Sequence, residues 1–467
     1  MITFVPEPHL LDSPRGRHWP ALRARGGEFV DGPPPSSAEV VVVGAGPAGL
    51  AVASALWHHG VRDIVMLDRQ GGSCRRFFDR VDLLRQRVLR SPYEHHPGVE
   101  GYRDCELLDF ARLHWSLLTS VERNEIRMAQ AGHRSVVPVD VFEAYCRHIT
   151  ASHHTDRRTW RAGVHRVEPS ADSVTVRTDA GSVTAPYVVL CQGEDRREAP
   201  GDWSDGVLPT GVSHWDQPAP SGAGPLVVVG AGLSAAHLVS NGLAAGRPVS
   251  WVVRETAERY QCADVNSTFF RPEGRARFDN VEWADRLRLM GTFRRASIMF
   301  EFRPGFERAE ETGQLRVHRG GGVVGLTAEA GGTPAVRLES GVVVGGEHVV
   351  LALGTVPSVG TGLMDDELVA VRDGWPDLDG RTLAFRNAPR VFVVGAAAGM
   401  VLGPAARNID GHRVATARVS VTVAAGLGRT GVPAPAETIR PGTTHSGTTH
   451  PGAVDPGAVP AGAVVGV

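Results

Sequence analysis

One stretch, residues 39–49, constrains the fold more than any other part of the chain. It reads E-V-V-V-V-G-A-G-P-A-G, in which four consecutive valines run directly into a glycine-rich turn. Such a run is typical of a strand buried on both faces of a parallel sheet, and the apolar residues 50–57 predict a helix after the turn. In a unit of this kind one glycine makes the turn, one lets the backbone approach a diphosphate, and one lets helix and strand pack closely. The diphosphate then lies at the helix N-terminus, where free N–H groups favour an anion.

The residues that follow support a dinucleotide-binding βαβ unit. Residues 63–67 form a second apolar run that ends at Asp68, 24 positions after Gly44. A carboxylate at about this spacing binds ribose hydroxyl groups in such units. We therefore predict that the first unit holds a dinucleotide through the following residues: Gly44, Gly46, Pro47, Ala48, Gly49, Asp68 and Arg69.

The same pattern returns later in the chain. Residues 226–229 lead into G-A-G-L-S-A, and a strand at 249–253 ends at Arg254, again 24 positions after the first glycine. An arginine here suits a ribose 2′-phosphate, whereas a carboxylate suits a free hydroxyl group. The second unit is therefore predicted to prefer NADPH, although Arg254 as a solvated surface residue is the alternative. The predicted contacts are these: Gly230, Gly232, Leu233, Ser234, Ala235 and Arg254.

Three further apolar strands end in small residues. They are predicted at 187–190, 347–353 and 390–394, and each runs into a glycine-containing segment. Small residues at these ends allow a helix N-terminus to approach a bound cofactor closely. The predicted contacts from these segments are Gly193, Gly354, Thr355, Gly395, Gly403 and Pro404.

Composition narrows the function classes. The net charge is −2, so no large attraction to nucleic acid or an anionic membrane is expected, and with no long apolar run we expect a cytoplasmic protein. All 49 basic residues are arginine, which excludes Schiff-base catalysis on lysine. The five cysteines include no C-x-x-C, which argues against a redox dithiol, a disulfide framework or a zinc site. The adjacent histidine pairs diverge on a helix or strand, so no metal is predicted.

The order of the motifs adds a family resemblance. They are G-A-G-P-A-G at 44–49, V-L-C-Q-G at 189–193, G-A-G-L-S-A at 230–235 and A-L-G-T at 352–355. Over roughly residues 38–425 the chain resembles the single-component flavin-dependent monooxygenases. The resemblance implies an α/β fold with two Rossmann-like dinucleotide-binding domains, in which the NADPH domain is inserted in the FAD domain.

The expected organisation follows from this resemblance and from composition. Helices are predicted at 107–121 and 140–149. The expected parts are an N-terminal arm laid over the first domain at 1–37, an FAD-binding domain at 38–215 and 346–425, an NADPH-binding domain at 222–345, and a disordered tail at 426–467.

One segment indicates a particular group within the family. It is residues 264–273, D-V-N-S-T-F-F-R-P-E. They are similar to a segment of the N-hydroxylases of ornithine and lysine, which implies that Asn266 contacts the substrate or the nicotinamide. An ordinary polar loop is the alternative. The F-x-G-x-x-x-H fingerprint of Baeyer–Villiger enzymes is not met, and the lysine that some ornithine hydroxylases use on the substrate is absent. These residues therefore do not identify the substrate.

The resemblance implies the following chemistry. FAD reduced by NADPH would react with molecular oxygen to give a flavin C4a-hydroperoxide, which transfers one oxygen atom to a small nucleophile, with N-hydroxylation of an amine or amino-acid-like metabolite preferred. Together with Asn266, Gln86 and Arg90 are the candidate catalytic residues. Arg85 and His95 are candidates to line the substrate cleft between the two dinucleotide domains. The alternatives are Baeyer–Villiger or S-oxygenation, an FAD/NADPH oxidase or reductase without oxygen insertion, and a non-catalytic FAD-bearing protein. A homo-oligomer is possible.

Overall fold

The structure is a computed structural model. It describes residues 8–19, 29–98, 106–204, 206–218, 221–262, 264–265, 269, 272–328 and 332–429. The predicted disordered tail beyond residue 429 and the candidate Asn266 lie outside these residues.

The first sheet carries the first glycine-rich turn. Its six strands follow the order β20-β21-β9-β1-β2-β5. The strands are β1 (Val40–Val43), β2 (Ile64–Asp68), β5 (Thr159–Arg161), β9 (Tyr187–Leu190), β20 (Ala384–Phe385) and β21 (Ala388–Val393). β1 pairs in parallel with β2 and β9, and all four of its valines are buried, as a strand covered on both faces requires.

The second sheet carries the second glycine-rich turn. Its five strands are parallel and follow the order β11-β18-β12-β13-β14. They are β11 (Val212–His214), β12 (Leu226–Val229), β13 (Val249–Val253), β14 (Leu315–Arg319) and β18 (His348–Leu351). Because the first sheet takes strands from both sides of this segment, the second domain is inserted in the first, which confirms the predicted fold class. With β11 and β18, the second sheet extends past the expected bounds of 222 and 345 at both ends.

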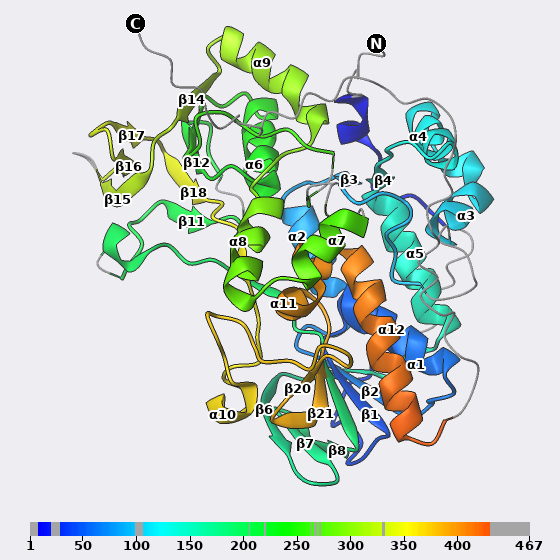
Figure 1. Cartoon of the computed structure of the whole chain (residues 1–467). Helices are drawn as coiled ribbons and strands as arrows, with labels where there is room; N and C mark the ends of the chain where they lie inside the picture. Colours follow the sequence, from blue (N-terminus) through cyan, green and yellow to red (C-terminus); the bar gives the residue numbers. More distant parts are fainter. Residues whose placement is uncertain are drawn as a thin grey trace, which may run out of the picture. The chain divides into compact units, whose positions relative to one another are not determined.

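Helices cover both sheets. α1 (Pro47–His58) and α12 (Ile409–Gly426) lie side by side, and α6 (Leu233–Ala244) packs on β12 and β13 (Figure 1). The remaining helices are α2 (Arg75–Leu83), α3 (Glu106–Leu113), α4 (Ser120–Gln130), α5 (Val139–Ser152), α7 (Pro272–Asp279), α8 (Trp283–Phe293), α9 (Arg303–Glu311), α10 (Asp366–Val369) and α11 (Gly399–Leu402). The 3₁₀ helices are η1 (Pro8–Asp12), η2 (Trp115–Leu117), η3 (Thr155–Arg157), η4 (Gly201–Trp203), η6 (Phe300–Phe302), η7 (Ala396–Ala398) and η8 (Pro404–Arg407).

Four small sheets complete the described chain. They consist of β3 (Val88–Leu89) with β4 (Val137–Pro138), β6 (Val164–Pro169) with β7 (Val174–Thr178) and β8 (Gly181–Ala185), β10 (Glu194–Arg196) with β19 (Thr355–Pro357), and β15 (Val323–Ala328) with β16 (Pro334–Leu338) and β17 (Val343–Gly345).

The helix predicted at 107–121 is wrong in extent. α3 ends at Leu113, and a new helix, α4, begins at Ser120. The cause is a capping box: the Thr119 hydroxyl accepts the backbone N–H of Glu122, and the Glu122 carboxylate accepts the backbone N–H of Thr119 at 2.9 Å. This box satisfies two amide groups that a continuous helix would bond internally, so it starts a helix here.

The N-terminal arm contacts both domains, and not the first alone as expected. Leu10 is buried in the apolar cluster of the second sheet, together with Trp251 and Phe302. Trp19 is buried among the helices of the first domain. Between them, Arg17 pairs with carboxylates of α4 and α5, so the arm is fixed by burial and charge.

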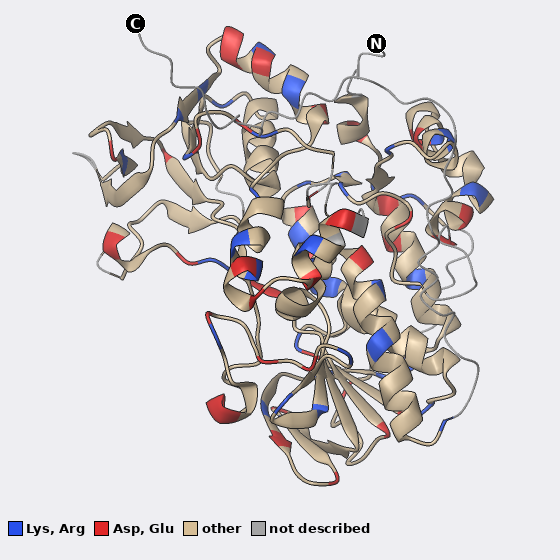
Figure 2. Ribbon diagram, in the orientation of Figure 1, with Lys and Arg blue, Asp and Glu red and all other residues tan. Residues whose placement is uncertain are grey.

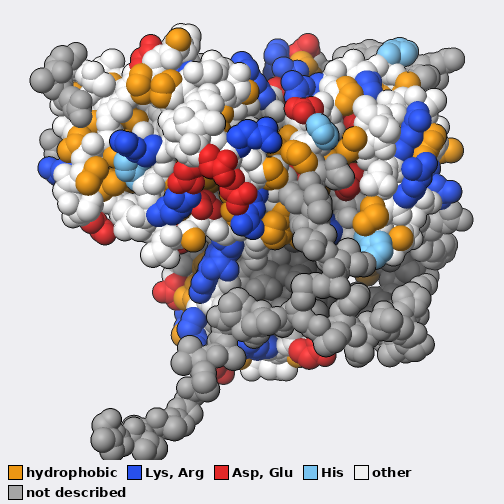
Figure 3. All heavy atoms as spheres, turned by 90° about the horizontal axis from the view of Figure 1, so that it is seen from above, with side chains coloured by type: hydrophobic (Ala, Val, Ile, Leu, Met, Phe, Trp, Pro, Cys, Tyr) orange, Lys and Arg blue, Asp and Glu red, His pale blue; other side chains and the backbone are white. Residues whose placement is uncertain are grey.

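Charges are mixed on the surface. Arginine and acidic side chains are interspersed along the ribbon in Figure 2 and lie next to one another on the face in Figure 3. Among the described residues, none of the helices has the length and apolar character to cross a bilayer.

Candidate functional site

Three glycines of the first turn have three different surroundings. Gly44 has φ +100°, and a Cβ there would lie 2.4 Å from the carbonyl oxygen of Cys191. A Cβ at Gly49 would lie 1.9 Å from the Gly44 carbonyl oxygen, whereas a Cβ at Gly46 would meet nothing within 4 Å. Gly44 therefore turns the chain, Gly49 packs helix on strand, and Gly46 leaves its backbone open to a ligand. Pro47 and Ala48 begin α1 directly after it.

Asp68 closes this turn from the end of β2. Its carboxylate accepts the backbone N–H groups of Ala45 and Gln70, each at 2.9 Å. Each carboxylate oxygen has a second lone pair, so the group can also accept ribose hydroxyl groups. Arg69 follows it and is exposed.

Unpaired polar atoms surround the same edge of the sheet. Among the buried side-chain atoms of the described chain that have no hydrogen-bond partner are the Ser73 hydroxyl, Gln192 Oε1, His412 Nδ1 and the Thr416 hydroxyl. Ser73 follows β2, Gln192 follows β9, and His412 and Thr416 lie on α12. Burial lowers the pKa of His412 to about 4, so its ring is neutral at pH 7. Buried polar groups are normally paired, so these atoms indicate a site for a polar ligand, and the residues fit a flavin dinucleotide.

Three other predicted glycine contacts of the first site, Gly193, Gly354 and Gly395, follow strands, and Gly403 follows α11. Gly193, Gly354, Gly395 and Gly403 all have positive φ, and a Cβ on either of the first two would meet nothing within 4 Å. Gly403 is different, because its Cβ would lie 2.3 Å from the Phe269 ring. Gly403 therefore serves packing as well as the turn before Pro404, which begins η8.

The second turn repeats the first. Gly230 has φ +134°, and its Cβ would lie 2.2 Å from the carbonyl oxygen of Ala352, while Gly232 is open. The buried Ala235 replaces the third glycine, and the Gly230 carbonyl here accepts a hydrogen bond from the Trp251 indole at 2.6 Å. Leu233 and Ser234 begin α6. The internal duplication thus extends to the backbone geometry of the turn.

Arg254 follows β13 and is available to a ligand. Its side chain is 83% exposed and forms an ion pair with the neighbouring Glu255 at 3.4 Å. An exposed guanidinium directly after β13 fits a ribose 2′-phosphate bound at the second turn.

Two of the catalytic candidates, Gln86 and Arg90, donate hydrogen bonds to backbone carbonyl groups. The Gln86 amide donates to the carbonyl of Val88 at 2.8 Å. Arg90 is buried and donates to the carbonyl groups of Gln261 and Ser297, both at 3.1 Å. Arg90 therefore joins the two domains, and a catalytic role for either residue is not favoured by this geometry.

The two cleft candidates have different surroundings. Arg85 is exposed at the end of α2. His95 is half-buried, and burial lowers its pKa against the opposing charges of Asp410 and Glu94.

Sequence reasoning missed a charged cluster between the two sites. Glu194 on β10 contacts Arg407 of η8 at 2.6 Å, and Arg407 also donates to the Thr355 hydroxyl at 3.0 Å. Glu194 directly follows the predicted contact Gly193, but its partners lie more than 150 positions away. No local pattern reveals such a pairing.

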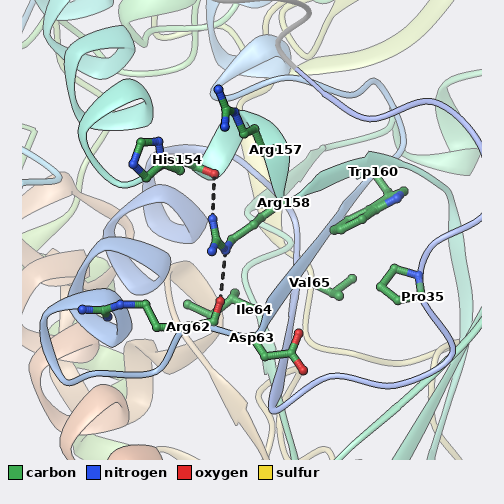
Figure 4. Close-up of a pocket in the computed structure, with 9 residues that line it drawn as sticks. All are labelled: Pro35, Arg62, Asp63, Ile64, Val65, His154, Arg157, Arg158 and Trp160. Carbon is green, nitrogen blue, oxygen red and sulfur yellow. Dashed lines mark hydrogen bonds between the residues drawn. The ribbon is translucent and has the colours of Figure 1, made fainter.

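A surface hollow of about 420 Å³ lies at the opposite edge of the first sheet, where β2 begins (Figure 4). Arg158 there donates to the carbonyl groups of Arg62 and His154 at 3.0 and 3.3 Å. The side chains of Arg62, Arg157 and Arg158 point in different directions in Figure 4, so they form no single anion site. Within the described ranges no cluster of potential metal ligands occurs.

Comparisons with known proteins agree with this architecture. Residues 37–94 match the family of FAD binding domains. No curated protein matches the chain by sequence.

Several solved structures share the fold. The reduced ornithine hydroxylase of Pseudomonas aeruginosa is 18% identical with a TM-score of 0.67, over 84% of this chain and 100% of that one. The FAD-bound cadaverine monooxygenase of Erwinia amylovora is 14% identical with a TM-score of 0.63, over 84% and 95%. The bacillithiol disulfide reductase of Bacillus cereus is 16% identical with a TM-score of 0.55, over 84% and 99%. These likenesses establish the fold alone, and the reactions named for these proteins differ from one another.

Proposed function

We propose that the protein is an FAD- and NADPH-dependent monooxygenase that transfers one oxygen atom to a small nucleophile, with an amine or amino-acid-like substrate that becomes N-hydroxylated. The observation that carries the proposal is the pair of open glycine turns with different ribose-facing residues, Asp68 and Arg254. The similarity to an ornithine hydroxylase and a cadaverine monooxygenase supports an amine substrate. A cytoplasmic location and a homo-oligomer remain predictions.

The roles of the chain follow from its geometry. Bound FAD would supply the redox chemistry and the activation of oxygen. The backbone at Gly46 and Asp68 would hold its diphosphate and ribose, and the unpaired atoms of Gln192 and His412 would orient it. Arg254 would bind the 2′-phosphate of NADPH. The side chains around both sites must also exclude water, because water in the site would let the oxygen-transferring oxidant decay to hydrogen peroxide before it meets the substrate.

A reductase without oxygen insertion is the second candidate, supported by the likeness to a disulfide reductase. The described cysteines do not favour a dithiol mechanism. Cys74 and Cys146 are in contact, but both are buried, and burial together with the neighbouring thiol raises the pKa of Cys146. The Cys146 thiol therefore stays protonated, and both buried thiols are out of contact with a disulfide substrate at the surface.

A product assay tests the proposal. The FAD-loaded protein is incubated with NADPH, oxygen and L-ornithine, L-lysine or cadaverine in turn, and products are identified by mass spectrometry. We expect one amine to gain a single oxygen atom in proportion to the NADPH consumed. Equimolar hydrogen peroxide with no oxygenated amine would instead support an oxidase, and activity without oxygen consumption would support the reductase.

A further inference from the structure

A two-stranded ribbon joins the two sheets. β10 follows the end of β9, and β19 follows the end of β18, and the two strands pair antiparallel. The ladder continues into the glycines, because Gly193 accepts the backbone N–H of Ser358 at 3.2 Å and Gly354 accepts that of Arg197 at 3.0 Å. Since β9 and β18 both end at the edge that carries a glycine turn, the ribbon lies between the two predicted dinucleotide sites.

Glu194 is the side chain at which this ribbon meets η8. Its carboxylate is 16% exposed and contacts Arg407 at 2.6 Å. The Thr355 hydroxyl, on the other strand of the ribbon, accepts from Arg407 and is itself hydrogen-bonded to Glu194. One carboxylate and one guanidinium therefore hold both strands to the segment 403–407, which contains two of the predicted flavin contacts.

Other arginines fix the ribbon from further directions. Arg80 of α2 donates to the Glu194 carbonyl at 3.2 Å, and Arg76 pairs with Asp195 at 3.1 Å. From the second domain, Arg294 at the end of α8 approaches Glu194 at 3.9 Å. Of these contacts, the Glu194–Arg407 pair is the shortest, and both of its side chains are largely shielded from water, which strengthens a charge pair.

We propose that Glu194 is a positioning residue: through Thr355 and Arg407 it fixes segment 403–407 against the ribbon and so sets how the two dinucleotide sites face each other. This inference rests on the proposed use of two cofactors. It predicts that Glu194 controls electron delivery between the sites. Loss of its charge should weaken FAD binding less than it slows reduction, because Glu194 lies outside both glycine turns and acts on the flavin contacts only through Thr355 and Arg407.

The variant Glu194→Gln tests this role, since it keeps the side-chain volume and removes the charge. The matched control is Glu198→Gln. The Glu198 carboxylate lies just beyond the ribbon, is 63% exposed and pairs with Arg196. In the full-length protein, Glu194→Gln should slow flavin reduction by NADPH about tenfold or more, because small misplacements between reacting groups are costly. The dissociation constant for NADPH and the rate of reduction by dithionite should match the wild type, and the variant should still bind FAD to full occupancy. In the apoprotein, amide hydrogen exchange of residues 193–197 and 403–407 should quicken.

A pH profile separates positioning from general loss of structure. Burial raises the pKa of Glu194, opposed by Arg407 and Thr355 and reinforced by Asp264, with Arg294 and Arg80 also facing it. The charged form that Arg407 requires is lost as the pH falls through this raised value. The wild-type reduction rate should therefore fall on the acid side, while Glu194→Gln should show no such dependence.

Each outcome decides the proposal. An unchanged reduction rate, or unchanged hydrogen exchange in the apoprotein, would overturn it, and so would a variant that loses FAD and is slow with both reductants. If NADPH fails to reduce even the wild-type flavin, the proposed function is wrong, and the exchange measurement on the apoprotein still decides whether Glu194 fixes the segment.

Discussion

At the scale of single residues, the glycines of the first turn divide into those that the fold needs and one that the ligand needs. A Cβ at Gly49 collides with the Gly44 carbonyl, whereas Gly46 has open space and an ordinary φ of −67°. Sequence reasoning assigned these three kinds of role from the spacing alone, because spacing and backbone geometry are linked in a βαβ turn.

This division gives a matched pair of variants. Gly46→Ala should leave the free energy of unfolding of the apoprotein unchanged or raise it by about 0.5 kcal/mol, because alanine restricts the unfolded chain. It should weaken FAD binding by about tenfold or more, since the methyl group occupies the space of the diphosphate. Gly49→Ala should lower the free energy of unfolding by about 1–3 kcal/mol or more through overpacking. Urea unfolding and FAD titration measure both, and equal FAD affinity in Gly46→Ala and the wild type would refute the assignment.

At the scale of elements, the N-terminal arm shows what the sequence did not reveal. Arg17 donates to the Glu122 carboxylate at 2.7 and 3.0 Å and to Asp140 at 2.7 Å, and both carboxylates are buried. These residues lie over 100 positions apart, so no periodicity connects them. The arm therefore looked irregular in sequence but is held by a buried charge network.

Arg17→Ala should cost about 3–5 kcal/mol of the free energy of unfolding, because the buried Glu122 loses its cation and the buried Asp140 loses the nearer of its two. Arg112→Ala is the control, since that side chain is 53% exposed and its pair with Asp109 should be worth about 0.5 kcal/mol or less. Urea denaturation of both variants gives the comparison. Similar losses in the two would show that the network does not stabilise the arm.

At the scale of the whole molecule, the two sheets share a core. Leu84, Val88 and Val136 come from the first domain but are buried in the cluster of the second sheet, where Leu10 also lies. Arg134 adds a bidentate ion pair with the buried Glu301 at 2.5 and 3.0 Å. The two dinucleotide-binding parts therefore belong to one cooperative unit.

A fragment of residues 222–345 should accordingly show no cooperative unfolding transition. The longer fragment 206–358 retains all five strands of the second sheet, and it should also fail, because it lacks the four apolar residues contributed by the rest of the chain. Thermal unfolding followed by circular dichroism measures both fragments against the full-length protein. A sharp transition in the longer fragment would show that the second domain folds alone.

The sequence predicted what depends on local pattern. The strands around both glycine turns and the spacing to Asp68 and Arg254 follow from runs and intervals of residues, whereas the inserted second domain was expected from the family resemblance. It did not predict the break before α4, the role of Arg90 as a link between domains, or the contact of Glu194 with Arg407. These depend on side chains that meet only after folding.

The measurement that tests the central claim most directly is rapid-mixing absorbance spectroscopy of the FAD-loaded protein. The flavin is reduced with NADPH without oxygen and then mixed with oxygenated buffer. The account predicts a transient spectrum, distinct from oxidised and reduced flavin, that persists for seconds with NADP⁺ bound and decays faster when the substrate amine is added. Immediate recovery of oxidised flavin, with hydrogen peroxide formed in equal amount, would contradict it.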